Sequence, residues 1–436
     1  MIELIYIFFF CIFVFTFFSF SFLPIFLISI KNYQKYELNY YIVNNIIILF
    51  LLIFIFVILK INFYILVLVS IFSYIYLLFF KYQKFKNFLK KNISSFIDYF
   101  FLLIIFYLIS VSIVANLGLW WDGNYWVTKA QVFYNYDGVN GLKNTIHINY
   151  PFLGPSLWAF TWKLSIIKYE VYGRLFYIFF YIISIYLITS FYFKSFTKKI
   201  LITSFFIFIC NSHHHLFLGY QEVLLFSMIL ITLLKFKYYL KFGDNLNLIL
   251  LIISLFLLLM IKQEGFLAFI ILSYLIFRNF EVIHQQTKIK ILLILICIII
   301  FKFLLFKLFF YNVAIEKNIL ADTLHIKYFI LNLENIETLT NSLFLIMISI
   351  FKVLFKNQLF LVFLLSIFIN KQDFTKNFFL IFIILLVYSS PFLFTDPEAF
   401  NLQRHLNTSL YRVTFSATAF FIPIILNIIK NQKLYK

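Results

Sequence analysis

Long apolar runs alternate with short polar connections along nearly the whole chain. A run of about 20 apolar residues is long enough to cross a bilayer as a helix. The pattern therefore predicts an all-α polytopic membrane protein with about 11 to 13 transmembrane helices. The predicted spans are 2–30, 42–59, 61–80, 97–117, 172–193, 200–217, 219–234, 246–261, 265–278, 291–311, 342–370, 377–394 and 408–429.

Three places along this map need comment. The run 2–30 starts without a basic region and has no small-residue cleavage site, so we predict a retained span rather than a signal peptide. The break at Lys60 is the weakest boundary. The segment 336–356 also fits an amphipathic helix lying in the interface, because Lys352 and Lys356 fall on one face.

The longest stretch that cannot sit in lipid is 116–175. It holds six of the nine glycines and all five tryptophans. We predict an outward-facing functional loop at 118–171, with a short helix lying on the membrane at 125–130 and an outer-surface helix at 155–167. Residues 1–96 would be N-terminal accessory spans, and residues 97–436 would form the transmembrane core that carries this loop.

Composition excludes several classes of protein. With 64% hydrophobic and 12% charged residues, the chain is not a soluble domain. The net charge of +19 is better explained by membrane topology than by nucleic-acid binding, so no nucleic-acid partner is expected. The three cysteines lie inside apolar runs and suggest neither a disulfide framework nor a metal motif. No glycine-rich phosphate loop is present, which argues against nucleotide binding.

Basic residues are unevenly distributed between the two sides of the predicted map. The side of 81–91 collects 21 of the 36 Lys and Arg residues against 5 of the 17 acidic ones. Because positive charge is retained on the cytoplasmic side, this side is predicted to be cytoplasmic. The loop 116–175 would then lie on the periplasmic, outer face of the cytoplasmic (inner) membrane.

The polar residues that are hardest to place in lipid gather on the predicted outer side. Ionisable groups at the edge of a span are costly unless they are paired or functional. Their convergence from four stretches of chain predicts one site. They are Asp122, His147, Arg174, His213, His214, His215, Glu222, Lys262, Glu264, Asp396, Arg404, His405 and Arg412.

Asp122 is the central residue of this set. It follows Trp120 and Trp121 at the headgroup level, where a lipid-linked phosphate would meet the protein, and Gly123 would let the backbone turn. Its carboxylate could act as a general base on an acceptor hydroxyl or hold a divalent cation, Mg²⁺ or Mn²⁺, against a phosphate. The alternative is that Asp122 is an ordinary solvent-exposed residue of the loop. Lys129 would reach toward anionic headgroups.

The remaining candidates each have a plainer alternative. Arg174 could clamp a phosphate or lie among headgroups. Lys262 and Glu264 could belong to the site or form a local salt bridge. His147 could contact the acceptor or lie in an ordinary loop. The run His213–His215 is better explained by a wet loop than by a metal site, because three consecutive helical residues point three ways.

Four motifs in order resemble the GT-C superfamily of polytopic glycosyltransferases, which includes the protein O-mannosyltransferases and the lipid A aminoarabinose transferases. The coverage is about 116–412. Against the family pattern, Gly123 stands where a second acidic residue is usual, Glu222 replaces an aspartate, Arg404 replaces a common tryptophan, and three spans precede the core. The motifs are WWDGNYWVTKA with NYPFLGPSLWAF and GRL, FLGYQEVLLF, KQEGFLAF, and DPEAFNLQRHLNTSLYR.

The resemblance implies transfer of a sugar, with inversion, from a polyprenyl-phosphate donor to a glycan, lipid or protein acceptor. Asp122 would be the leading catalytic carboxylate, as base or metal ligand, and Glu222 the second. The implied substrate-binding residues are Lys129, His147, Tyr150, Arg174, Lys262, Glu264, His405 and Arg412. An O-antigen polymerase or ligase and a transporter or flippase are the alternatives. The enzyme hypothesis requires that Asp122, Glu222 and Arg174 approach one outer-face cavity.

Overall fold

A computed structural model gives the fold of the chain. It describes residues 2–29, 35–115, 118–119, 121–136, 138–145, 150–210, 217–279, 285–316, 330, 336–394 and 399–431. All regular elements within these ranges are helices, which confirms the all-α class. Eight of the described helices are long and apolar enough to cross a membrane, or nine if one bent pair counts as a span. Three shorter apolar helices accompany them, so the predicted 11 to 13 spans include helices below full length.

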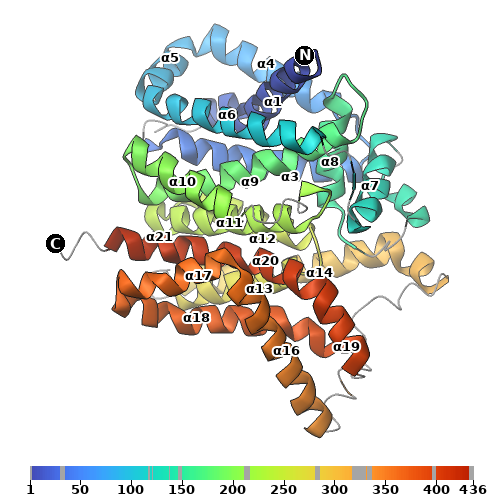
Figure 1. Cartoon of the computed structure of the whole chain (residues 1–436). Helices are drawn as coiled ribbons and strands as arrows, with labels where there is room; N and C mark the ends of the chain where they lie inside the picture. The colour runs from blue at the N-terminus through green and yellow to red at the C-terminus, as the bar shows by residue number, and fades with distance from the viewer. Residues whose placement is uncertain are drawn as a thin grey trace.

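The first half of the chain forms one side of a bundle (Figure 1). Helix α6 connects two ends of the bundle, with α5 at one end and α7 and α8 at the other. We call these the α5 end and the α7 end. The helices are α1 (Ile2–Phe20), α2 (Leu23–Ser29), α3 (Leu38–Ile58), α4 (Tyr64–Phe80), α5 (Tyr82–Lys91), α6 (Ile93–Ala115), α7 (Trp121–Tyr134), the 3₁₀ turn η2 (Val139–Asn144), α8 (Leu153–Leu164), α9 (Val171–Tyr192) and α10 (Phe196–Cys210).

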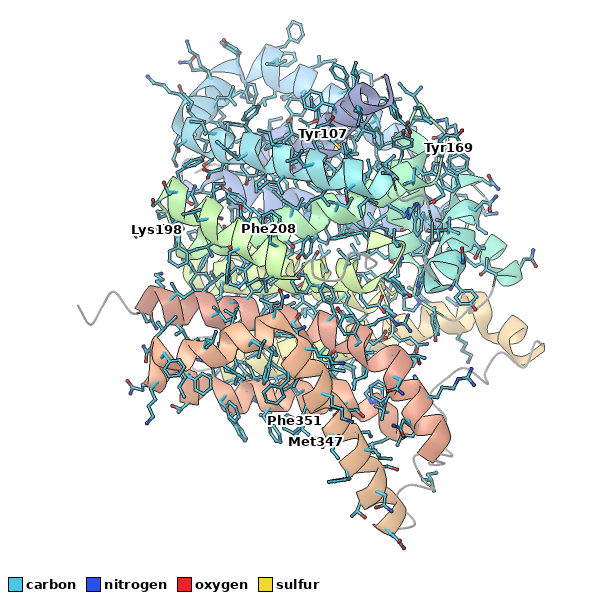
Figure 2. The ribbon with its side chains drawn as sticks, in the orientation of Figure 1. Tyr107, Tyr169, Lys198, Phe208, Met347 and Phe351 are labelled. Carbon is cyan, nitrogen blue, oxygen red and sulfur yellow. The ribbon has the colours of Figure 1, made fainter. Side chains whose placement is uncertain are left out.

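The second half packs against the first along α9 and α11 (Figure 1). Figure 2 marks the two ends, because Lys198 near the start of α10 lies at the α5 end and Tyr169 just before α9 lies at the α7 end. The helices are α11 (Glu222–Phe242), α12 (Asn245–Leu259), α13 (Gly265–Arg278), α14 (Gln285–Glu316), α16 (Ile336–Lys356), α17 (Gln358–Leu365), η6 (Ser366–Phe368), α18 (Lys371–Ser389), η7 (Ser390–Phe394), α19 (Ala399–His405), the π-helical turn η8 (Leu406–Leu410), α20 (Tyr411–Ala417), η9 (Thr418–Phe420) and α21 (Phe421–Asn431).

Helix α9 is the centre of the bundle. Nearly all of its side chains are buried, because large apolar residues follow one another around its whole circumference. It packs against α6, α8, α10, α11 and α21. Such a helix fixes the relative positions of its neighbours, including α8 and α11 at the α7 end.

The N-terminal spans pack into the core rather than beside it. Helix α3 contacts α8 and α12, and α1 contacts α6 and α9. Buried polar pairs reinforce these contacts: Asn39 donates to Ser190 at 2.7 Å, and the Lys235 ammonium donates to Asn44 at 2.6 Å and to Asn247 at 2.5 Å. The described part of residues 1–96 thus shares a continuous interior with the other described helices.

The boundary at Lys60 is confirmed. Helix α3 ends at Ile58 and α4 begins at Tyr64, with Lys60 in the left-handed region at φ 56°. Tyr136 of the loop donates to Asn62 at 3.0 Å, and Tyr64 donates to the Lys163 carbonyl at 3.1 Å. The α3–α4 connection therefore supports the loop that follows α6.

Both short helices predicted in the loop exist, but their environments differ from the prediction. The segment 125–130 belongs to a longer helix, α7, so Gly123 lies inside a helix and not in a turn. The predicted surface helix 155–167 is α8, which spans Leu153–Leu164 and is almost fully buried. Its sequence is apolar on all sides, and α3, α7 and α9 cover it. The prediction of an outer-surface helix was wrong for that reason.

Glycine permits a close approach that seats α7 on the bundle. A Cβ at Gly123 would lie 2.4 Å from the Leu218 carbonyl oxygen, and one at Gly219 would lie 2.8 Å from the Gly123 Cα. Gly219 also has φ 103°, which side chains rarely adopt. These two glycines bring the start of α11 against α7.

Helix α16 occupies the range of the predicted amphipathic segment, 336–356. It crosses the other helices obliquely at the edge of the bundle, and its labelled residues Met347 and Phe351 lie on the lower side in Figure 2. Residues Leu339–Lys356 also satisfy the length and composition of a span. Both predicted roles for this segment therefore remain compatible with its structure.

Candidate functional site

A buried ionic cluster lies where α11 begins. Glu222 is the first residue of α11 and is 1% exposed. A carboxylate at this position is stabilised by the positive end of the helix dipole. The Lys262 ammonium, from the α12–α13 connection, lies 2.8 Å from Glu222 Oε1 and 2.9 Å from Glu264 Oε1. Burial disfavours the charged ammonium, but the two carboxylates outweigh it and raise the pKa of Lys262.

The second oxygen of Glu222 differs from the first. Glu222 Oε2 is buried and has no hydrogen-bond partner among the residues that the structure describes. A buried carboxylate oxygen in this state is costly, and such atoms are rare unless a ligand or water satisfies them. One oxygen of Glu222 is therefore anchored, and the other can accept a proton or a hydrogen bond from a ligand.

Arg412 closes the cluster from α20. Its Nη1 lies 3.8 Å from Glu222 Oε1, and its guanidinium carbon lies 5.2 Å from the centre of the Tyr220 ring. The residue follows the π-helical turn η8, and its Nε donates to the Thr408 carbonyl at 3.3 Å. Single π-turns of this kind are frequent at functional sites because they re-aim the side chains that follow.

Helix α7 supplies the facing wall. Lys129 is 1% exposed, and its ammonium lies 3.5 Å from the Tyr150 carbonyl oxygen. The ammonium is 5.4 Å from the Trp126 ring centre and 5.7 Å from that of Tyr150. Burial lowers the pKa of Lys129 to about 7. The prediction that Lys129 reaches toward headgroups was wrong, because α7 turns this side chain into the protein.

These groups line one cavity of about 340 Å³ at the α7 end. Its walls come from α7, the segment before α8, the start of α11, the α12–α13 connection with the start of α13, η7, α19, η8 and α20. Seven of the ten predicted site residues line it, from every stretch that predicted the site: Lys129, Tyr150, Glu222, Lys262, Glu264, His405 and Arg412.

Arg174 does not line this cavity. Its side chain is fully buried at the start of α9, where Nη2 pairs with Glu170 at 2.9 Å and Nη1 donates to the Gly118 carbonyl at 3.2 Å. The expected meeting of Arg174 with Glu222 in one cavity was therefore wrong, and the condition set for the enzyme hypothesis is not met for Arg174. A proposal for this site rests on the other cavity residues alone. Glu170 precedes Arg174 by four residues, a spacing at which opposite charges pair on a helix.

Other predicted residues lie outside the described part of the chain. The structure describes the helical backbone of Asp122, the second residue of α7, but not its side chain. His147, Asp396 and the run His213–His215 are outside the described residues altogether. Arg404 is described on α19 and is exposed, away from the cavity lining.

The cavity also contains residues that were not predicted. Trp126 was not among the predicted site residues, yet it lines the cavity and is 3% exposed inside the protein. The spacing of Tyr125, Trp126 and Lys129 on one helical face was a signal for a shared wall. The additional lining residues are Tyr125, Trp126, Gln263, Phe266, Leu267, Pro391, Phe392, Ser409 and Val413.

The predicted divalent-cation site is not tested by the structure, because the Asp122 side chain lies outside the described residues. Glu222 and Glu264 are arranged around an ammonium, and the described part of the chain holds no group of three His, Cys, Asp or Glu placed to bind a metal. Mg²⁺ can bind through one or two carboxylates together with substrate phosphates and water, so the Mg²⁺ or Mn²⁺ site at Asp122 and Glu222 stays a prediction.

No family model, curated protein or solved structure gives a significant match to this chain.

Proposed function

We propose that the chain is a membrane glycosyltransferase that moves a sugar from a polyprenyl-phosphate donor to a glycan, lipid or protein acceptor. The observation that carries the proposal is the half-anchored carboxylate of Glu222 in a cavity with three basic side chains. The cavity lies at one end of a bundle of membrane-spanning helices. A substrate with a lipid tail and a charged, polar head suits that position.

The basic residues fit a phosphate. Lys129, Lys262 and Arg412 face two described carboxylates, Glu222 and Glu264, so the side chains of the cavity leave an excess of positive charge when Lys129 is protonated. When the bond between the anomeric carbon and the phosphate oxygen breaks, the electron pair stays on the leaving lipid phosphate. Fixed cations in a buried site stabilise such developing charge, often as the largest single contribution to catalysis.

A carboxylate would take the proton of the acceptor. As the acceptor oxygen attacks the anomeric carbon from the face opposite the phosphate, its proton passes to a general base, and the configuration inverts. Glu222 would be the base, with Oε2 taking the proton while Lys262 holds Oε1 in place. Asp122 is the other candidate base, through the family resemblance. No step requires a metal ion.

The sugar itself would lie against aromatic rings. Trp126 and Tyr150 have ring centres 6.0 Å apart and line the cavity beside Lys129. The C–H faces of a pyranose ring are apolar, and aromatic walls exclude water from them while the few polar groups fix orientation. With the lysine-rich α5 end on the cytoplasmic side, the reaction would take place at the outer face of the membrane.

Transfer can be tested with the purified protein in liposomes and a panel of synthetic undecaprenyl-phosphate sugars. We expect at least one donor to release undecaprenyl phosphate in the presence of membrane glycans or lipids, and a chelator to leave the rate unchanged. Asp122→Asn and Glu222→Gln should each lower the rate at least 100-fold if that residue is the base. Lys290→Gln, on the opposite side of the predicted topology, serves as a control.

Each outcome has a consequence. If Asp122→Asn releases undecaprenyl phosphate as fast as the wild-type protein, Asp122 is not the base. The same reasoning applies to Glu222→Gln and Glu222. Wild-type protein inactive with all donors would contradict the proposed function. Loss of activity on chelation would contradict the metal-free step.

A further inference from the structure

We propose that α5 forms a binding surface for anionic phospholipids at the α5 end of the bundle. The surface comprises the lysines of α5 and the exposed apolar residues at its two junctions. It lies at the opposite end from the candidate active site, and it does not depend on the proposed function.

The first observation is the orientation of α5. Helix α4 ends at Phe80 and α5 begins at Tyr82, and the two helices are bent by 99°. If α4 follows the direction of the spans, α5 must lie along the membrane plane, across the end of the bundle. Figure 1 shows it turning back there toward the start of α6.

The second observation is that α5 has two chemically different faces. Phe88 is 1% exposed and its ring meets that of Tyr41 at 5.4 Å, while Phe85 contacts the Tyr74 ring. These residues hold the helix on the bundle. Lys86 and Lys90 lie on the opposite face, and no acidic residue occurs between positions 81 and 91. The exposed lysines of this segment are Lys81, Lys86, Lys90 and Lys91.

The third observation is a group of exposed apolar side chains next to the lysines, at the two ends of α5. Phe79 and Phe80 are 80% and 69% exposed at the end of α4, and Ile93 is 59% exposed at the start of α6. Such groups are stable in acyl chains and costly in water. A basic helix next to inserted apolar residues is the composition of elements that bind anionic membrane surfaces.

The surface is held in place before any lipid binds. Asn92, just after α5, is 4% exposed; its side chain accepts from the Leu38 backbone amide at 3.1 Å and donates to the Phe88 carbonyl at 2.9 Å. These bonds attach the end of α5 to the start of α3. Because little ordering is needed on binding, the lysines act as a preformed patch.

The charged residues near α5 keep this surface positively charged. Lys198 at the start of α10 is exposed at this end (Figure 2). Two described acidic residues at this end are paired with lysines: Glu37 with Lys194 at 2.7 Å, and the buried Asp98 with Lys199. The patch thus stays basic when the nearby carboxylates are included, and it matches phosphate-bearing headgroups in charge.

The test uses the full-length protein in neutral detergent, with native mass spectrometry to measure binding of phosphatidylglycerol and of phosphatidylcholine with the same acyl chains. We expect the anionic lipid to bind more tightly. The triple variant Lys81→Gln, Lys86→Gln, Lys90→Gln should lose on the order of 100-fold in that affinity at low salt, about fivefold per lysine. The corresponding arginine triple should retain it.

A matched control removes three lysines predicted to lie on the same side but outside α5: Lys288→Gln, Lys290→Gln, Lys371→Gln. Melting temperatures in detergent check that all variants fold. Equal affinity for the two lipids, or an equal loss in the control triple, would overturn the proposal. Unchanged lipid binding in the α5 triple would show that the lipid binds elsewhere on the protein and would also overturn the proposal.

Discussion

Removing the Lys262 ammonium should destabilise the protein more than any other single change in the cavity. The Lys262 and Glu222 side chains are 9% and 2% exposed, so Lys262→Met leaves a buried carboxylate without its closest partner. Breaking a buried ion pair from one side typically costs 3–5 kcal/mol. Arg412, 3.8 Å from Glu222, offsets part of this cost, and we therefore expect a loss of about 3 kcal/mol, at the lower end of that range.

The free energy of unfolding can be measured by titrating the detergent-solubilised protein with SDS. Glu264→Gln is the control, because its side chain is more exposed at 19% and Lys262 keeps Glu222; it should cost about 1 kcal/mol or less. The double variant Lys262→Met, Glu222→Gln should regain about 1–2 kcal/mol relative to Lys262→Met. A loss below about 0.5 kcal/mol in Lys262→Met would refute the assigned ion pair.

Three further predictions concern other parts of the site and its support. Because burial gives Lys129 a pKa of about 7, its ammonium loses its proton as the pH rises, so the affinity of the protein for a polyprenyl phosphodiester, which does not titrate, should fall by up to tenfold per pH unit above pH 7. The Lys129→Met variant should bind this ligand weakly at every pH. An affinity of the wild-type protein that does not change with pH would contradict the assigned role of Lys129. The Gly123→Ala substitution should destabilise the protein by about 1–3 kcal/mol, because the new Cβ would meet the Leu218 carbonyl oxygen. Gly118→Ala is the control in the same SDS titration, since a Cβ at position 118 would meet no atom within 4 Å. The Tyr6→Phe substitution removes the hydroxyl that accepts hydrogen bonds from the backbone amides of Ile166 and Ile167 at 2.9 and 3.2 Å. Hydrogen exchange at these two amides should therefore become faster. Unchanged exchange would show that α1 does not hold this segment in place.

The positions of the spans could be predicted because lipid leaves the backbone few alternatives. Helices α3, α9, α12 and α13 lie within a few residues of the apolar runs that predicted them. Helix α8 shows the limit of that approach. Its residues are apolar on every side, which predicts burial but cannot distinguish burial in lipid from burial in protein.

The candidate site was predictable where a charge stands at the edge of an apolar run. Glu222, Lys262 and Arg412 were identified for that reason, and they meet in one cavity. Lys129 and Arg174 were misplaced because their surroundings depend on tertiary packing. The direction of α7 buries Lys129, and the turn before α9 gives Arg174 the partner Glu170.

The buried Lys235 has a consequence for how the chain is made. Its ammonium is fully buried between Asn44 and Asn247, with the Tyr40 ring centre 4.7 Å away. Asn44 precedes Lys235 by 191 residues, so α3 is synthesised before α11. A lone ammonium in lipid is strongly disfavoured, and α11 therefore needs a waiting partner. We therefore expect the assembly of α11 to depend on the N-terminal spans.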